Sequence, residues 1–139
     1  MKKELRLQEI QKIQLNLQKP CLVFLYWDLW AGKTTLSQSI INNQLSGKVS
    51  VTSPTYVYYN RYEDIYHFDL YRIRDYDEFV SIGWEEILDN NDWIILIEWP
   101  ELLEKYYTPD IKIILSKTQD NLKREIEIES IIPQNHCFG

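Results

Sequence analysis

Two short runs of apolar residues divide the chain, and both are typical of strands that are buried on both faces of a sheet. The first run, CLVFL, covers residues 21–25, and the second, WIILI, covers residues 93–97. Continuous apolar runs of this length occur in parallel sheets, which carry helices on both faces. Between the two runs the sequence predicts a helix that begins at Lys33 or Thr34 and ends near Leu45.

Elsewhere the pattern predicts hairpins and short helices. Residues 48–62 and 64–73 are rich in β-branched and aromatic side chains, so we expect an antiparallel hairpin that turns between them. The stretch DYDEFVSIGWEEILDN predicts two short helices interrupted at Gly83. The alternating EIEIE near the end predicts a last hairpin that turns around residues 118–121. Residues 4–17 carry apolar side chains at a loose helical spacing, which predicts a helix there.

Charge is unevenly distributed along the chain. The net charge is −6, but residues 63–104 hold 13 acidic and 2 basic residues, a net charge of −11. Because phosphate binding depends on lysine and arginine, this acidic segment argues against a protein that binds nucleic acid unaided. The segment is either a solvated acidic surface or a surface that docks on a basic protein partner.

The composition also indicates where the protein works. No apolar run approaches the ~18 residues that are needed to span a bilayer, so we expect no membrane segment. The first residues show no secretion signal. Cys21 and Cys137 lie far apart in the sequence, which fits a reduced chain without a disulfide framework. We therefore expect one cytoplasmic domain that covers residues 1–139.

The strongest chemical signal is the segment VFLYWDLWAGKTT, residues 23–35. Gly32, Lys33 and Thr34 follow an apolar strand and open a helix, which is the context of a phosphate-binding loop. In such a loop backbone N–H groups and the helix N-terminus surround the phosphates. The lysine reaches the β- and γ-phosphates, and the hydroxyl after it ligates Mg²⁺. The alternative is an ordinary helix N-terminus with a threonine cap and a solvated lysine.

Two carboxylates lie in or at the end of buried strands. Glu98 ends WIILIE, at the edge of the sheet where α/β proteins bind ligands, so it is a candidate to hold Mg²⁺ through water or to polarise an attacking water. A glutamate at this point can equally reach solvent. Asp69 stands in HFDLYR, where a buried acid needs a metal or a partner such as Arg72. We expect His67 and the neighbouring tyrosines to pack on the hairpin faces, with stacking on a base as the alternative.

A strand, a loop, a helix and a later strand that ends in a carboxylate form the skeleton of an α/β nucleotide-binding domain. Five segments, GKTTLSQSI, SPTY, YHFDLYRI, IGWEEIL and LIEWPE, also stand in the order and spacing of the TsaE family, which the chain resembles over about residues 20–105. That family consists of small bacterial ATPases of tRNA threonylcarbamoyladenosine biosynthesis. The resemblance implies a P-loop NTPase-like single domain, with a mixed parallel and antiparallel central sheet flanked by helices.

The resemblance also implies cofactors, partners and site residues. ATP and Mg²⁺ would be the cofactors, with Lys33, Asp69 and Glu98 as catalytic residues and Thr34, Asp69 and Glu98 as metal ligands. The nucleotide-binding residues would be Asp28, Leu29, Trp30, Ala31, Gly32, Lys33, Thr34, Thr35 and Trp99. Partners of the TsaB and TsaD kind would carry the tRNA, so this chain would meet tRNA only indirectly.

The chain departs from the family at the loop itself. The family pattern G-D-L-G-A-G-K stands here as W-D-L-W-A-G-K over residues 27–33, with Trp27 and Trp30 in place of two glycines. Glycine allows the loop backbone to adopt a positive φ and to touch the phosphates. An indole at either position fills space that a phosphate needs. If both tryptophans are present in the protein, we expect poor affinity for nucleotide.

Three interpretations of the tryptophans remain open. The loop is degenerate and the protein is a docking subunit, or the loop turns both rings outward, or Trp27, Trp30 and Trp93 are recoded glycines. The third interpretation rests on the genetic code. TGA differs from the glycine codon GGA by one base, and some bacterial lineages read TGA as glycine. A translation table that assigns TGA to tryptophan would then print Trp where the cell inserts Gly. Five tryptophans against four glycines support it, and mass spectrometry of the native protein decides it.

A P-loop kinase for a small metabolite is a weaker alternative, because the chain shows no obvious lid or acceptor-binding insertion.

Overall fold

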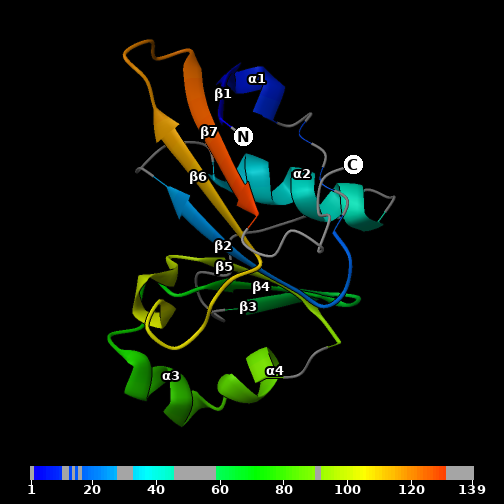
Figure 1. Cartoon of the computed structure of the whole chain (residues 1–139), viewed down its shortest axis with the longest axis vertical. Coiled ribbons are helices and arrows are strands. Elements are labelled where there is room, and N and C mark those ends of the chain that lie inside the picture. The colour runs from blue at the N-terminus through cyan, green and yellow to red at the C-terminus, as the bar shows by residue number, and fades with distance from the viewer. Residues whose placement is uncertain are drawn as a thin grey trace.

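The computed structural model describes residues 2–10, 13, 15, 17–27, 33–45, 59–89 and 92–130 (Figure 1). The side chains of Leu7 and of residues 33–35 are not described. In chain order the elements are β1 (Lys2–Arg6), α1 (Leu7–Ile10), β2 (Cys21–Trp27), α2 (Lys33–Leu45), β3 (Tyr59–Tyr62), β4 (Ile65–Asp69), α3 (Tyr76–Ile82), α4 (Glu85–Asp89), β5 (Ile94–Glu98), η1 (Pro100–Leu103), β6 (Ile111–Lys117) and β7 (Lys123–Ser130).

Within these residues seven strands form one sheet in the order β1-β7-β6-β2-β5-β4-β3. The centre of the sheet is parallel: β2 lies between β6 and β5 and runs parallel to both, and β4 runs parallel to β5. The flanks are antiparallel, because β7 pairs with β6 and with β1, and β3 pairs with β4. The expected mixed sheet is therefore confirmed.

Helices cover both faces of the sheet (Figure 1). On one face, Leu36 and Ile40 of α2 share a core with Val23 and Leu25 of β2. On the other face, α3, α4 and η1 surround a second core that includes Phe24 of β2. Successive side chains of a strand point to opposite faces, so a central strand must be apolar at every position to serve both cores. This is why the CLVFL run shows no alternation.

Most of the predicted elements are confirmed. The helix after the loop begins at Lys33 and ends at Leu45, and the first hairpin turns between β3 and β4. The last hairpin, β6–β7, also forms as expected. The two short helices α3 and α4 are separated at Gly83, whose φ of 91° is accessible to glycine without strain and whose N–H donates to the Val80 carbonyl at 2.9 Å.

The predicted helix over residues 4–17 is wrong in its first part. Residues 2–6 form β1, which pairs with β7 in antiparallel register, and α1 is only four residues long. Only Leu5 of β1 is buried, so the strand has no alternating pattern to reveal it. The backbone N–H and C=O groups of β1 pair with β7, a strand more than a hundred residues away in the sequence. Local periodicity carries no information about that pairing. Gly47, residues 48–58 and Cys137 lie outside the described residues.

Candidate functional site

Three strands bring the candidate residues to one edge of the sheet. In the parallel register Leu25 of β2 is paired with Glu98 of β5, and Glu98 is paired with Asp69 of β4. Glu98 and Asp69 are the last residues of their strands. β2 continues for two more residues to Trp27, and the chain enters α2 at Lys33. The two carboxylates are therefore neighbours at the edge of the sheet where β2 ends, directly before residue 28 in the sequence.

The same face of the sheet holds both carboxylates. Residues two apart in a strand share a face, so Glu98 lies on the side of Leu96 and Asp69 on the side of Ile65. Leu96 and Ile65 belong to the core that α2 covers. Asp69 is 7% exposed and Glu98 is 2% exposed. Both acids thus lie beneath the layer that contains α2, and burial makes an unpartnered charge at either position expensive.

Asp69 is held by the turn that follows it. Its Oδ1 accepts a hydrogen bond from the backbone N–H of Tyr71 at 3.0 Å, an interaction of the kind that aspartate makes two residues along in a turn. The N–H of Leu70 donates to the Glu98 carbonyl at 3.1 Å. These two bonds fix where β4 ends relative to β5. The side chain of Arg72, the alternative partner of Asp69, is exposed.

Glu98 is hydrogen-bonded to a histidine that the sequence assigned to packing, with stacking on a base as the alternative. The imidazole Nε2 of His67 and Oε2 of Glu98 form a hydrogen-bonded pair, and the His67 side chain is 1% exposed. His67 lies on β4 two residues before Asp69, so the two share a face of the strand. The signal in the sequence was a single polar ring in an otherwise apolar buried strand, two positions before an acid.

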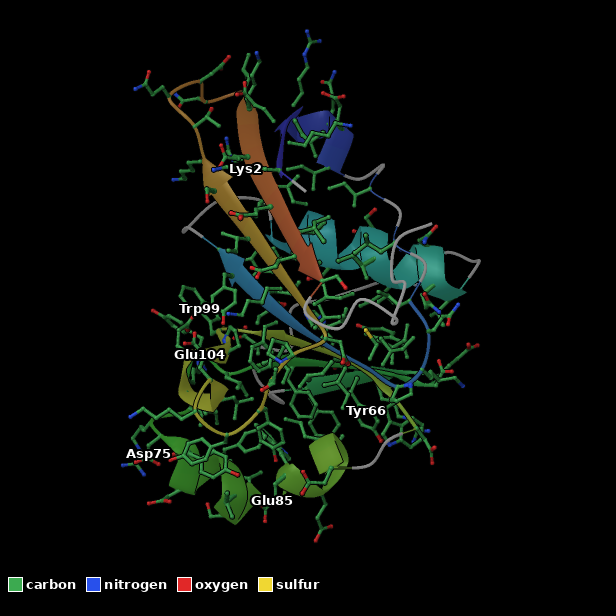
Figure 2. The ribbon with its side chains drawn as sticks, viewed as in Figure 1. Lys2, Tyr66, Asp75, Glu85, Trp99 and Glu104 are labelled. Carbon is green, nitrogen blue, oxygen red and sulfur yellow. The ribbon has the colours of Figure 1, made fainter. Side chains whose placement is uncertain are left out.

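Trp99 follows Glu98 with a backbone that few residues adopt. Its φ is 59° and its ψ is 57°, the left-handed region that is strained for a bulky side chain, and Pro100 comes next at the start of η1. The Trp99 ring lies 5.2 Å from that of Tyr71, which is 66% exposed. Figure 2 labels Trp99, which directly precedes η1 at the end of β5. Strain of this kind concentrates at functional sites.

Most of the predicted loop lies outside the residues that the structure describes. Residues 28–32 are not described. They are the predicted nucleotide ligands Asp28, Leu29, Trp30, Ala31 and Gly32. Lys33, Thr34 and Thr35 form the first turn of α2, as the phosphate-site interpretation requires, but their side chains lie outside the description. The structure thus places the backbone of the helix start and leaves the ligand set of the loop a prediction.

The described tryptophans are packed into the fold. Trp27 is buried in the α2-side core, and its indole Nε1 has no hydrogen-bond partner among the residues that the structure describes. Trp84 makes edge contacts with Phe68 and Phe79 in the opposite core. Trp93 packs edge-on against Tyr66, and the guanidinium of Arg61 lies 4.7 Å from its ring centre. These contacts accommodate the rings of Trp84 and Trp93 within the fold.

The donor set at this edge suits one kind of metal. In the described part of the chain no group of three or more histidine, cysteine, aspartate or glutamate residues is placed to hold an ion by itself. Mg²⁺ commonly takes only one or two protein carboxylates and completes its shell with water and phosphate oxygens. The adjacent pair of Asp69 and Glu98 fits such an ion bound together with a nucleotide, and it does not fit a metal held by protein alone.

The fold and the edge define the class of protein. The sheet has a parallel centre with antiparallel flanks, and helices cover both of its faces. Strand β2, which is followed by helix α2, lies beside β5, a strand that ends in an acid. Together these features make an α/β fold of the P-loop NTPase-like type. That is the predicted fold class. At this coarse level the fold is that of a nucleotide-binding protein.

Comparison with known proteins identifies the family. The family model of threonylcarbamoyl adenosine biosynthesis protein TsaE matches residues 2–126, and the chain belongs to that family. It is 37% identical over 127 residues to the tRNA threonylcarbamoyladenosine biosynthesis protein TsaE of Rickettsia prowazekii, covering 88% of this chain and 85% of that protein. It is 40% identical over 93 residues to the protein of the same name from Haemophilus influenzae, covering 64% of this chain and 58% of that protein.

A solved structure supports the fold. The crystal structure of YdiB from Bacillus subtilis superposes with a TM-score of 0.71 and 23% sequence identity, covering 97% of this chain and 88% of that one. Within the described residues no helix is long and apolar enough to cross a membrane.

Proposed function

We propose that this protein binds and hydrolyses Mg-ATP as an accessory subunit for the threonylcarbamoyl modification of the tRNA adenosine next to the anticodon. It would act in the cytoplasm as one domain, residues 1–139, together with partners of the TsaB and TsaD kind. Membership of the TsaE family supports the pathway. The observation that carries the ATPase activity is the pairing of Asp69 with Glu98 at the edge from which the loop before α2 leaves.

The roles follow from position and chemistry. ATP would supply the phosphoryl group that is transferred to water, and Mg²⁺ would neutralise charge on the phosphates. Lys33, at the start of α2, would bind phosphate, and the Thr34 hydroxyl would ligate the metal. Asp69 would hold the metal or its water. Glu98, the last residue of β5, would orient the attacking water and accept its proton.

The surrounding residues would complete the nucleotide site. The backbone of residues 28–32 would surround the phosphates, and Thr35 would support this loop from the first turn of α2. Trp99 would lie beside the nucleotide, since it directly follows Glu98 at the same edge. Because the segment of residues 63–104 is strongly acidic, the partners would supply the basic surface that binds tRNA.

A second candidate function is favoured by the two tryptophans of the loop. Trp27 is buried at the end of β2, directly before the loop, where the family has glycine. If Trp27 and Trp30 obstruct the phosphates, the protein would serve as a docking subunit that no longer binds ATP well. Family membership does not separate the two functions, because both keep the fold and the partners.

A binding titration separates the two functions. We would titrate the polypeptide, made with the sequence as printed, with labelled ATP and Mg²⁺, and measure capture of the TsaB-like and TsaD-like partners in parallel. The variant Lys33→Ala serves as a control for binding through the loop. Saturable binding at physiological ATP that Lys33→Ala weakens supports the ATPase, and hydrolysis is then measured with the partners present. Absence of ATP binding with retained partner capture supports the docking subunit.

A further inference from the structure

His67 is the buried polar group of the site to which the proposed function assigns no role. Its side chain is 1% exposed, and its Nε2 is hydrogen-bonded to Oε2 of Glu98. A polar ring enclosed in a sheet must be hydrogen-bonded to be tolerated, and here its partner is the acid at the centre of the proposed chemistry. We propose that His67 is a positioning residue, which holds the Glu98 carboxylate through Oε2 and leaves Oε1 to act on water. The proposal rests on the proposed ATPase function.

The hydrogen-bonding pattern fixes the tautomer of the ring. A carboxylate oxygen only accepts, so Nε2 of His67 carries the hydrogen and donates it. Nδ1 is buried and has no hydrogen-bond partner within the described ranges of the chain. A hydrogen on Nδ1 would be a buried donor without an acceptor, which is costly, whereas a bare lone pair there costs less. Both atoms therefore favour the form with the hydrogen on Nε2.

The strand register makes this contact a means of orienting Glu98. His67 is paired with Leu96 and Asp69 with Glu98, so the imidazole reaches Glu98 diagonally from the neighbouring strand. A glutamate side chain has three rotatable bonds, and a donor that comes from a rigid parallel strand selects one arrangement of them. Groups that orient a reacting or ligating residue in this way typically change activity 10- to 100-fold when they are removed.

Two substitutions distinguish positioning from packing. The amide nitrogen of glutamine lies three bonds from Cβ, as Nε2 of histidine does, whereas that of asparagine lies two bonds away, as Nδ1 does. His67→Gln therefore keeps a donor near Oε2, and His67→Asn withdraws it. We expect His67→Asn to lower kcat about 10- to 100-fold with KM for ATP changed by less than about twofold. His67→Gln should keep kcat within about threefold of the parent.

A double-mutant cycle tests whether His67 acts through Glu98. Glu98→Asp shortens the acid by one methylene and breaks the contact while it keeps a carboxylate, so residual activity is measurable. If His67 acts through Glu98, His67→Asn lowers kcat no further in the Glu98→Asp background. An equal loss in both backgrounds, or a loss in His67→Gln as large as that in His67→Asn, overturns the proposal and makes His67 a packing residue.

A spectroscopic measurement tests the contact without ATP. The chain has two histidines, His67 and His136, so long-range ¹H–¹⁵N spectra of the imidazoles are readily assigned with His67→Gln. The expected result is a His67 ring with its hydrogen on Nε2, and a hydrogen on Nδ1 alone overturns the positioning role even if ATP is hydrolysed. If the ring has the expected form but the protein and its partners hydrolyse no ATP, the proposed function fails and takes the positioning role with it.

Discussion

At the scale of single residues, Glu98 combines position and restraint. It is the last residue of a buried strand, it is adjacent to Asp69, and it is held by His67. An acid that is both enclosed and oriented suits general-base or water-orienting chemistry, because its geometry is set before the substrate arrives.

The first prediction concerns this acid. We expect Glu98→Gln to lower kcat for ATP hydrolysis about 100-fold or more, since a positioned general base contributes about that much, while ATP binding is retained. Steady-state hydrolysis with the partners and a binding titration measure the two quantities. Glu129→Gln, the same change on the exposed surface of β7 and outside the acidic segment, is the matched control and should leave both quantities unaltered. Equal activity of Glu98→Gln and the parent would show that this carboxylate has no part in hydrolysis.

Two substitutions of Trp99 separate the cost of its backbone strain from the cost of losing the indole ring. Its φ of 59° favours glycine, so Trp99→Gly should have a free energy of unfolding about 1 kcal/mol higher than Trp99→Ala, although both lose the indole. Urea unfolding of the two variants gives the difference. At Ser81 in helix α3 the same pair should show the opposite order, because alanine is the better helix former there. An alanine variant of Trp99 as stable as the glycine variant contradicts the strain.

At the scale of elements, helix α3 is defined by its two ends. Asp75 has extended backbone and its Oδ1 accepts the N–H of Glu78 at 2.9 Å, and Gly83 ends the helix in the left-handed region. The helix is only seven residues long, so propensity contributes little and the ends and the buried Phe79 hold it. Figure 2 shows Asp75 and Glu85 with α3 and α4 on the side of the sheet away from α2.

The element-scale prediction follows from this cap. Asp75→Ala should lower the free energy of unfolding by about 1 kcal/mol because the Glu78 N–H loses its acceptor, and Asp75→Asn should recover most of that loss. Denaturant unfolding measures both variants. Arg74→Ala removes an exposed ion pair to Glu78 next to the cap, and we expect a smaller effect from it. A stability loss that is no larger in Asp75→Ala than in Arg74→Ala would contradict the capping role.

The elements differ in how far the sequence predicted them. Central strands, α2 and the β6–β7 hairpin were predicted because burial on two faces, helix ends and alternation are local signals. β1 was missed because it is defined by a partner strand at the far end of the chain, and only Leu5 of its side chains is buried. The adjacency of Asp69 and Glu98 was predictable only through the resemblance to the TsaE family, because the sequence of neither strand determines the register by itself.

The role of His67 shows the same limit in the candidate site. Its residue type and its place in a buried strand are visible in the sequence. The contact with Glu98 depends on which strands are neighbours and on their register, both of which arise from the whole sheet. Packing was therefore the simpler interpretation of this histidine from sequence.

At the scale of the whole molecule, the separation of charge predicts how the protein would bind the proposed partners. The segment of residues 63–104 has a net charge of −11, so we expect the protein alone to show no saturable binding to tRNA. We expect its affinity for the partner proteins to fall as NaCl rises from about 0.1 M to about 1 M, because the Debye length shrinks from about 10 Å to about 3 Å. Mobility-shift and calorimetric titrations measure the two interactions.

A pair of charge reversals shows which surface carries the electrostatic contribution to partner binding. Glu86→Lys lies in the acidic segment on α4, and Glu129→Lys makes the same change on β7 outside it. Glu86→Lys should weaken partner binding more than Glu129→Lys, and the difference should disappear at high salt. Affinity that is indifferent to salt and to both substitutions would make the acidic segment a solvated surface only.

The most direct test of the account maps the bound metal onto the sheet. We would add Mn²⁺ and ATP to ¹⁵N-labelled protein and measure which backbone amide signals are broadened by the paramagnetic ion. The account predicts the strongest broadening at Leu70 and Trp99, which follow Asp69 and Glu98, and weaker broadening at Cys21 and Ile94 at the opposite ends of β2 and β5. Broadening centred on Cys21 and Ile94, or no broadening at saturating Mn-ATP, would contradict a nucleotide site at this edge.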